Sequence, residues 1–281
     1  MAPDFSFDSI KKERNMKIAF IGGGNMGGAI IKAIIEKKIA DPSDIVVSDI
    51  DTAKQKSIAK ELKVKTVGDN AKAVKNVDVV ILAIKPQILS SVLEGLRGKM
   101  AEDQLVISII AGATTKTISK GLKHDIVVRV MPNTPAQISE GMSVWTATDE
   151  VTTEQEEMAT TILNALGKQI YFEDEKYIDM ATAISGSGPA YIYLIIESLT
   201  DAAVHIGLPR QQAEELVLQT ILGSTLFVKQ SGKHPAELRN MVTSPGGTTA
   251  EGLLKLEKRN LRATISKAVM ASYKKAKKLG S

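Results

Sequence analysis

The fold is decided by the stretch Lys17-Ile18-Ala19-Phe20-Ile21-Gly22-Gly23-Gly24-Asn25-Met26-Gly27. Its first half is a short apolar run bounded by glycine, which is typical of a buried strand. Its second half fits the pattern GxGxxG, and isoleucines at positions 30, 31, 34 and 35 then form one face of a helix. A second short apolar run follows at residues 45–48 and ends at Asp49. Strand, glycine turn, helix and strand in this order predict a dinucleotide-binding unit, and the alternative is a glycine-rich turn without a ligand.

The three motif glycines have separate expected roles. Gly22 allows the tight turn, Gly24 lets the backbone approach a pyrophosphate, and Gly27 lets the helix pack closely on the strand. Asp49 follows Gly27 by 22 residues. That distance is close to the spacing of about 20 at which an acidic side chain accepts a hydrogen bond from the ribose 2′-OH of NAD.

The residues around Asp49 bear on the choice between NADH and NADPH. No arginine follows Asp49 closely to receive a 2′-phosphate, although Ser48, Thr52 and Lys54 could hold one. We therefore expect NADH, or the use of both cofactors.

Length and composition narrow the class of protein. A chain of 281 residues can bury a large core and is expected to form two domains. The net charge is +4, but aromatic residues make up only 4% of the chain, so the basic, aromatic surface of a nucleic-acid-binding protein is not expected. Without cysteine there is no disulfide or thiolate nucleophile, and with no cluster of metal ligands we expect no metal site.

No targeting or membrane-spanning segment is expected. No apolar run approaches the roughly 20 residues that cross a bilayer. The first 15 residues contain three acidic residues and no long apolar region, unlike a secretory signal or a transit peptide. We expect a cytoplasmic protein without a membrane partner, in which residues 1–14 form an N-terminal extension.

Strands and helices continue to alternate through the first half of the chain. We expect further strands at residues 64–67, 77–84, 105–110, 126–131, 144–147 and 169–172, and helices at residues 71–77 and 153–166. The strand at 77–84 is apolar almost throughout, which indicates burial on both faces. Residues 15–172 are thus predicted to form an α/β, Rossmann-like NAD(P)-binding domain.

Strand ends in this domain supply further site candidates, because open α/β sheets bind ligands at the carboxyl ends of their strands. Lys85 follows the fourth strand, and Asn133 and Thr134 follow the sixth. For Lys85 the alternative is a solvated surface lysine. For Asn133-Thr134-Pro135 the alternative is a rigid turn that only shapes the crevice.

Residues 173–281 are predicted to form an all-α domain. Helices are expected at residues 177–184, 189–205, 209–230, 248–257 and 261–279, with a short helix opened by His234-Pro235. Six consecutive apolar residues at positions 191–196 indicate a helix that is either central in a bundle or buried against another subunit, which favours a dimer.

The loop Thr243-Ser244-Pro245-Gly246-Gly247-Thr248-Thr249 precedes one of these helices. A hydroxyl- and glycine-rich loop at a helix start presents unpaired N–H groups to an anion, and our hypothesis is that it holds a small carboxylate. The alternative is an N-capped turn between two helices. Leu253, Leu254 and Leu256 are expected to face inward from the helix that follows.

The residue inventory favours an imine over an alcohol as the hydride acceptor. His124, His205 and His234 have no evident carboxylate partner in the sequence and are expected to be structural. Alcohol oxidation calls for a positioned base, whereas an iminium accepts hydride directly and needs only a group such as the Thr249 hydroxyl to orient it. Glu197 and Asp201, four residues apart on an apolar helix, either balance buried polar groups or act directly.

Seven motifs together resemble the pyrroline-5-carboxylate reductase family over nearly the whole chain beyond the extension. They are Ile21–Gly27, Ala83-Ile84-Lys85-Pro86, Met131-Pro132-Asn133-Thr134-Pro135, Ile184-Ser185-Gly186-Ser187-Gly188-Pro189-Ala190-Tyr191, Gly207-Leu208-Pro209-Arg210, Gly232-Lys233-His234-Pro235 and the loop 243–249. The resemblance implies reduction of 1-pyrroline-5-carboxylate to L-proline by NADPH or NADH. It also implies a homodimer with interlocked helical domains, which in the family often stacks into larger rings such as a decamer.

The resemblance also implies roles for individual residues. The substrate carboxylate would be bound by the loop through Ser244, Gly247 and Thr248, and Thr249 would be the catalytic residue near the imine nitrogen. Cofactor contacts would come from Gly22, Gly24, Asn25, Met26, Gly27, Ser48, Asn70, Ala83, Lys85, Pro86 and Ala111, together with Asp49 as argued above.

The chain departs from the family pattern in two places. Asp49 and Asp51 add negative charge where many members hold a 2′-phosphate. Lys258-Arg259-Asn260 replaces the glycines common before the last helix.

Two alternative functions stay open on sequence alone. A related two-domain 3-hydroxy acid dehydrogenase would need a positioned lysine or histidine, and Lys229 and Lys233 lie in no recognisable motif. A non-catalytic nicotinamide-binding regulator would not need intact strand-end and substrate loops.

Overall fold

The computed structural model describes residues 16–280, and the expected extension at residues 1–14 lies outside them. The chain divides into two compact units. Among the described residues, unit 1 comprises residues 16–186 and 273–280, and unit 2 comprises Ser187–Ser272. The sequence-based boundary at 172–173 falls where the strands end. The compact units divide later because helix α7 (Lys176–Ala181), with Ile178 fully buried, packs with the strands β6 and β7 of unit 1.

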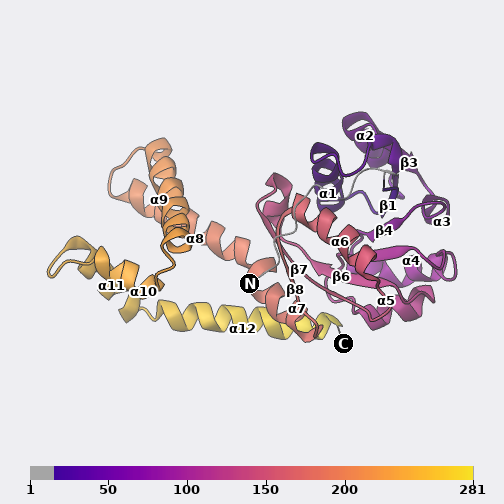
Figure 1. Ribbon diagram of the computed structural model, residues 1–281. Coiled ribbons are helices and arrows are strands. Elements are labelled where there is room, and N and C mark those ends of the chain that lie inside the picture. Colours follow the sequence, from indigo (N-terminus) through magenta and orange to yellow (C-terminus); the bar gives the residue numbers. More distant parts are fainter. Residues whose placement is uncertain (1–15, 281) are drawn as a thin grey trace. The chain divides into compact units, whose positions relative to one another are not determined.

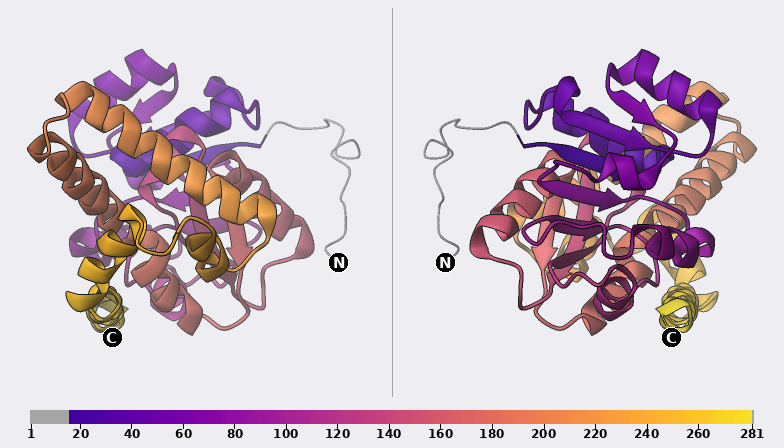
Figure 2. Two further views of the ribbon diagram at one scale, coloured as in Figure 1. Left: turned by 90° about the vertical axis from the view of Figure 1, so that its left-hand side faces the viewer. Right: turned by 90° about the vertical axis from the view of Figure 1, so that its right-hand side faces the viewer.

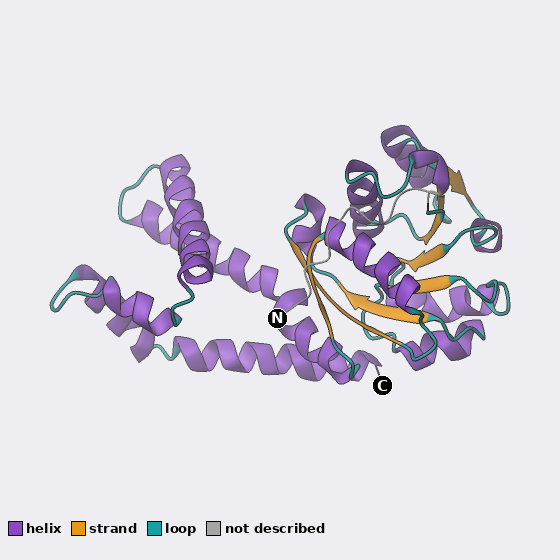
Figure 3. Ribbon diagram, viewed as in Figure 1, coloured by secondary structure: helices purple, strands orange, loops and turns teal. Residues whose placement is uncertain are grey.

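Unit 1 contains one eight-stranded sheet (Figures 1 and 3). Its strands are β1 (Ile18–Ile21), β2 (Ile45–Ser48), β3 (Lys65–Val67), β4 (Val79–Leu82), β5 (Leu105–Ser108), β6 (Val127–Met131), β7 (Gly141–Ala147) and β8 (Gly167–Tyr171). The order is β3-β2-β1-β4-β5-β6-β7-β8. All neighbours pair in parallel except β6 and β7. The first six strands have the Rossmann order, so the predicted Rossmann-like fold is confirmed.

Helices cover both faces of this sheet. One core contains residues of α1 (Asn25–Glu36), α2 (Thr52–Leu62) and α6 (Thr153–Ala165). The other contains residues of α3 (Asn70–Ala73), α4 (Leu89–Leu96) and α5 (Thr115–Leu122). Short 3₁₀ turns lie at Pro42–Asp44, Pro86–Ile88 and Thr134–Ile138. A π-helical turn, Thr182–Gly186, follows α7.

Strand β1 shows why the apolar runs are continuous. Ile18 and Phe20 belong to the first core, whereas Ala19 and Ile21 belong to the second. Since successive side chains of a strand point to opposite faces, a sheet covered on both faces needs apolar residues at every position. Strand β4 is fully buried for the same reason, as predicted.

Unit 2 is helical, as the left view of Figure 2 shows. It contains α8 (Gly188–His205), α9 (Arg210–Ser231), α10 (Pro235–Met241), α11 (Thr248–Lys258) and the first part of α12 (Leu261–Gly280). Proline occupies the first turn of α8 and of α10, where its missing N–H has no cost. Within residues 16–280, no helix is long and apolar enough to cross a membrane.

Much of the apolar surface of unit 2 is uncovered in a single chain. In α8, Leu194 is 62% exposed and Tyr193 is 56% exposed. The prediction that Leu254 and Leu256 face inward is wrong for one chain, because both are exposed. Helices α8 and α9 pack on each other, and many of the other apolar side chains on both helices are exposed in a single chain.

Candidate functional site

The glycine turn after β1 has the geometry that its motif requires. Gly22 has a φ of +101°, and a Cβ there would lie 2.6 Å from the Ala83 carbonyl oxygen. A Cβ at Gly27 would lie 2.7 Å from the Gly22 carbonyl oxygen. A Cβ at Gly24 would meet nothing within 4 Å. Gly22 and Gly27 therefore permit the close packing of β1, β4 and α1, whereas Gly24 borders open space.

That open space adjoins the start of helix α1. Gly24 is the N-cap residue, no side chain caps the helix, and the first turn, from Asn25, contains no acidic residue. The first-turn N–H groups, including those of Met26 and Gly27, thus keep their partial positive charge for an outside acceptor. These residues fit the pyrophosphate of a dinucleotide, which binds at such helix starts.

Asp49, at the end of β2, is fixed beside the same turn. Its Oδ2 accepts from the Gly23 N–H at 2.9 Å, and its Oδ1 accepts from the Asp51 N–H at 2.9 Å. The Asp49 carbonyl oxygen accepts from Gln55 Nε2 at 2.6 Å. Each carboxylate oxygen retains a second acceptor position. Asp51 itself caps α2 by accepting from the N–H groups of Ala53 and Lys54, so the two acidic groups differ in role.

Ser48 and Asn70 form a pair that the sequence alone does not indicate. Ser48 is buried, and its Oγ donates to Asn70 Oδ1 at 2.7 Å. The Ser48 carbonyl oxygen accepts from the Gly22 N–H at 2.7 Å. Asn70 is the first residue of α3. The end of β2, the start of α3 and the glycine turn are thereby joined.

The ends of β4 and β5 complete this edge of the sheet. The Ala83 N–H donates to the Ile21 carbonyl at 2.9 Å, so Ala83 lies directly beside the end of β1. Lys85 and Pro86 are exposed at the start of the 3₁₀ turn that follows. Ala111 lies three residues after β5. Since β1, β2, β4 and β5 are parallel neighbours, all these candidates share the carboxyl edge.

Asn133 has a structural partner. Its Oδ1 accepts from the Met142 N–H at 2.9 Å, which ties the turn after β6 to β7. Thr134 is exposed and opens the 3₁₀ turn at Thr134–Ile138. This contact supports the interpretation of residues 133–135 as a rigid turn.

The loop 243–249 opens helix α11 in unit 2. Gly246 has a φ of +66°, and no side chain caps α11, whose N-cap residue is Gly247. The Gly247 N–H donates to the Ser244 carbonyl at 3.1 Å, so this group is used within the turn, contrary to the expectation that it faces an anion. Ser244 and Thr248 are exposed and Thr249 is half-buried. The uncapped first turn begins at Thr248.

Two of the histidines have structural contacts. His124 is buried, and its Nε2 lies 2.6 Å from the Gln104 carbonyl oxygen. His234 Nδ1 accepts from the Ala236 N–H and caps α10. His205 is the exposed last residue of α8. Within residues 16–280 there is no group of three or more side chains suited to a metal ion.

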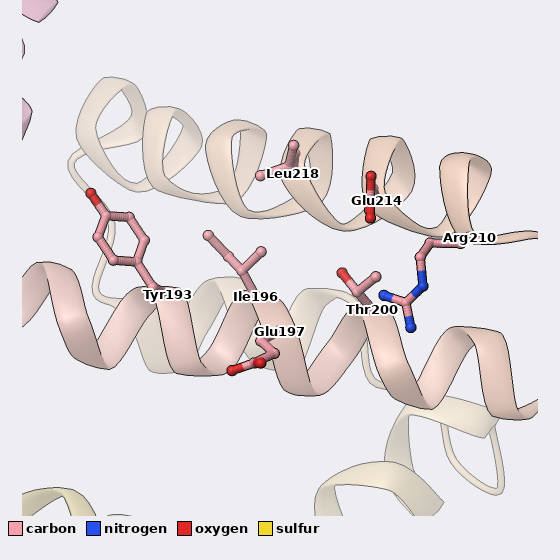
Figure 4. A pocket seen from close by; sticks show the side chains of 7 residues that line it. All are labelled: Tyr193, Ile196, Glu197, Thr200, Arg210, Glu214 and Leu218. Carbon is pink, nitrogen blue, oxygen red and sulfur yellow. The ribbon is translucent and has the colours of Figure 1, made fainter.

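Glu197 and Asp201 have different surroundings. Glu197 lines a cavity of about 340 Å³ between α8 and α9 (Figure 4). Asp201 accepts from Arg210 at 2.8 Å, and this hydrogen bond raises the pKa of the Arg210 guanidinium above its ordinary value. The other residues lining the cavity are Tyr193, Ile196, Thr200, Arg210, Glu214 and Leu218. The buried Thr200 Oγ1 has no hydrogen-bond partner in the described part of the chain.

The sheet order, the glycine turn and the carboxyl-edge cluster define a nicotinamide-dinucleotide-dependent oxidoreductase, and comparisons with known proteins agree. Residues 17–112 match a family model described as NADP oxidoreductase, coenzyme F420-dependent. Residues 175–279 match one described as pyrroline-5-carboxylate reductase dimerisation. The chain belongs to the pyrroline-5-carboxylate reductase family, as relatives matched over their full length show.

The relatives come from distant organisms. The pyrroline-5-carboxylate reductase of Synechocystis is 40% identical, over 95% of this chain and 99% of its own. That of Arabidopsis thaliana is 37% identical, over 94% and 96%. A structure from Coxiella burnetii has a TM-score of 0.86 at 38% identity and covers 95% of this chain and 100% of its own. One from Plasmodium falciparum, with NADP bound, has a TM-score of 0.88 at 35% identity, over 95% and 99%.

Proposed function

We propose that the protein reduces the C=N bond of 1-pyrroline-5-carboxylate and yields L-proline, with NADPH or NADH as hydride donor. The observation that carries the proposal is the full-length match to relatives of that activity at up to 40% identity. It is supported by the open glycine turn and the fixed Asp49 at the carboxyl edge of the sheet.

The cofactor would be held along the strand ends in the order of the sheet. Asp49, with Ser48 and Asn70 behind it, would bind the adenosine ribose at the end of β2. The pyrophosphate would be bound by Gly22 and Gly24 and by the first turn of α1, which contains Asn25, Met26 and Gly27. The nicotinamide half would contact the ends of β4 and β5, where Ala83, Lys85, Pro86 and Ala111 lie. When bound, the reduced nicotinamide supplies the hydride.

The substrate would be bound by the loop of unit 2. The Ser244 hydroxyl and the first-turn N–H groups from Thr248 on would hold the carboxylate. The Gly247 N–H would join them only by leaving the Ser244 carbonyl. Thr249 would orient the ring nitrogen through its hydroxyl. Because a protonated imine already carries positive charge, this arrangement needs no strong base.

The test is a cofactor-oxidation assay with purified protein and 1-pyrroline-5-carboxylate, followed by the loss of reduced-nicotinamide absorbance. Turnover with NADH or NADPH is expected, and proline should accumulate in equal amount. Absence of turnover with both cofactors would overturn the proposal. The ratio of kcat/KM for the two cofactors measures the preference, and we expect both to serve, with Asp49 favouring NADH.

We also propose that dimers stack into a decamer, in a cytoplasmic protein. The matched dimerisation region and the uncovered apolar faces of α8 and α11 support association between copies. Light scattering on the eluting protein measures the mass directly. A mass equal to ten copies of the 30.2-kDa chain is expected, and a mass of two copies would reject the decamer and leave the dimer.

A further inference from the structure

Arg129 is a buried charged residue to which the proposed reaction assigns no role. It lies on β6, and its side chain is only 3% exposed. Its guanidinium donates to Glu175 Oε1 at 2.8 Å and to Asp179 Oδ1 at 2.7 Å. Asp179 belongs to α7, and Glu175 is the N-cap residue of that helix. Burying the charge of an arginine costs free energy of desolvation, even when two carboxylates pair with it. Its contacts therefore indicate that the positions of these side chains matter to the protein.

Glu175, which Arg129 holds in place, also forms hydrogen bonds to a loop near the cofactor site. Its Oε1 accepts from the Thr115 N–H at 2.8 Å, and its Oε2 accepts from Thr115 Oγ1 at 2.9 Å. Thr115 is the first residue of α5. Residues 109–114 connect β5 to that helix and include Ala111. The carboxylate therefore holds the far end of the loop by two hydrogen bonds, and Arg129 holds the carboxylate.

The middle of the same loop lies close against a second element. Gly112 has a φ of +77°, and a Cβ there would lie 2.6 Å from the Leu279 carbonyl oxygen of α12. The last part of α12 belongs to unit 1. The chain leaves unit 1 after Gly186, a few residues beyond α7, and re-enters it at Tyr273 in α12. Both connections to unit 2 thus emerge from segments that lie against this loop.

The strand order indicates which part of a dinucleotide this loop would meet. The ribose of the adenosine half is assigned to Asp49 after β2, and the pyrophosphate to the turn after β1. Strands β4 and β5 lie on the opposite side of β1 from β2. A dinucleotide that crosses this edge in one direction would bring its nicotinamide to the ends of β4 and β5.

We propose that Arg129, Glu175 and Thr115 are positioning residues for the nicotinamide ring. They act by fixing residues 109–115, and none of them touches the reacting atoms. The inference rests on the proposed function, because it takes the loop after β5 as the surface behind the ring. Its consequence is that loosening the loop harms hydride transfer more than cofactor affinity, since the ribose and pyrophosphate contacts remain intact.

The decisive variant is Thr115→Val, which removes one hydroxyl and keeps the shape of the side chain. We expect kcat to fall about tenfold, because small displacements of reacting atoms are strongly amplified in rate. The dissociation constant of the cofactor should stay within about twofold. Thr115→Ser, which restores the hydroxyl, should recover most of kcat.

Thr153→Val is the matched control. Thr153 is likewise the first residue of a helix, but it is exposed, and its helix α6 belongs to the core on the other face of the sheet from α5. An unchanged kcat in Thr115→Val would overturn the inference. So would an equal loss in Thr153→Val, or a loss in cofactor affinity as large as the loss in kcat. Glu175→Gln provides a second variant if Thr115→Val folds poorly, with the same expected split between kcat and affinity.

Two measurements do not depend on turnover, and they separate this inference from the proposed function. Amide hydrogen exchange within residues 109–115 should be faster in Thr115→Val than in the wild type, and unchanged in Thr153→Val. The fluorescence anisotropy of bound NADH should decay faster in Thr115→Val, because its ring is less restrained. If the wild type fails to reduce 1-pyrroline-5-carboxylate, only the proposed function falls. If exchange and anisotropy are unaltered, the positioning role falls.

Discussion

At the scale of single residues, we expect Asp49 to have the largest effect on cofactor choice. Its carboxylate is aligned by the N–H groups of Gly23 and Asp51, so it cannot turn away from the proposed ribose position without losing both hydrogen bonds. Asp49→Ser would remove a 2′-OH acceptor and a charge that repels a 2′-phosphate. We predict that the ratio of kcat/KM for NADPH to that for NADH rises about tenfold, equivalent to about 1.4 kcal/mol.

Asp51→Ser is the control for this change. Asp51 caps α2, and serine is also a good N-cap residue, so the helix should persist while the charge is lost. The ratio of kcat/KM for NADPH to that for NADH should rise less in Asp51→Ser than in Asp49→Ser. Equal shifts in the two variants would mean that net charge near the loop, rather than the aligned carboxylate, sets the preference.

A second prediction at the scale of single residues concerns Thr249 and the binding of substrate. Thr249→Ala should lower kcat/KM for 1-pyrroline-5-carboxylate at least about tenfold, because an oriented hydroxyl at the ring nitrogen is lost. Cofactor affinity, measured by quenching of protein fluorescence, should not change. Thr264→Ala is the matched control, since Thr264 lies outside the loop on α12, is exposed, and its hydroxyl donates to the Asn260 carbonyl at 3.1 Å. A loss of cofactor binding in Thr249→Ala would contradict its assigned role.

The three glycines and the pair Ser48 and Asn70 show what sequence can and cannot predict at this scale. The roles of Gly22 and Gly27 depend on contacts a few residues away and on the neighbouring strand, so a local motif implies them. The Ser48–Asn70 hydrogen bond joins residues 22 positions apart, and the resemblance to the family suggests the two residues separately, without their contact. The Thr115–Glu175 contact spans 60 positions, and no local pattern indicates it.

At the scale of elements, helix α6 offers a clean test of local stabilisation. Thr152 Oγ1 accepts from the Gln155 N–H, and Gln155 Oε1 accepts from the Thr152 N–H, which together form a capping box. Thr152→Ala should lower the free energy of unfolding by about 1 kcal/mol, as measured by urea denaturation. Thr153→Ala, one position later and exposed, should have little effect. A null result for Thr152→Ala would show that Gln155 alone holds the helix start.

Elements with continuous apolar runs or proline starts were predictable, whereas shorter amphipathic ones were not. All eight strands and helices α8 to α12 follow from patterns within their own residues. Helices α2, α4 and α5 are short or mostly polar, and their residues show no pattern strong enough to predict them. The antiparallel pairing of β7 with β6 was likewise not predicted, since strand direction depends on the connection through the turn at residues 133–139.

At the scale of the whole molecule, the uncovered face of α8 predicts how the chain associates. Leu194 is 62% exposed and lies among other exposed apolar residues, namely Ile192, Tyr193 and Ile195. A charge introduced there would be buried without a partner in any assembly that covers this face. Leu194→Arg should therefore reduce the mass measured by light scattering toward a single 30.2-kDa chain. Lys60→Glu, an exposed change in α2, should leave the mass unchanged, and an unchanged mass in Leu194→Arg would contradict the prediction.

The prediction that Leu254 and Leu256 face inward was wrong, and the reason concerns the whole molecule. A hydrophobic pattern shows that a helix face is buried, but it does not say whether the neighbour is in the same chain. The six consecutive apolar residues at 191–196 indicate either kind of neighbour, whereas the spaced leucines of α11 resemble the inward face of a helix in a single chain. In the structure, both leucines are exposed in a single chain.

Helix α12 begins in unit 2 and ends in unit 1, which has a consequence for how the protein is made. The ribosome delivers the eight strands first, then all of unit 2, and only afterwards the segment from Tyr273 that packs against Gly112. The sheet can thus collapse early during translation, while a segment that lies against the loop after β5 is synthesised only after unit 2. A nascent chain stalled within unit 2 would therefore contain all eight strands and still lack the segment that lies against Gly112.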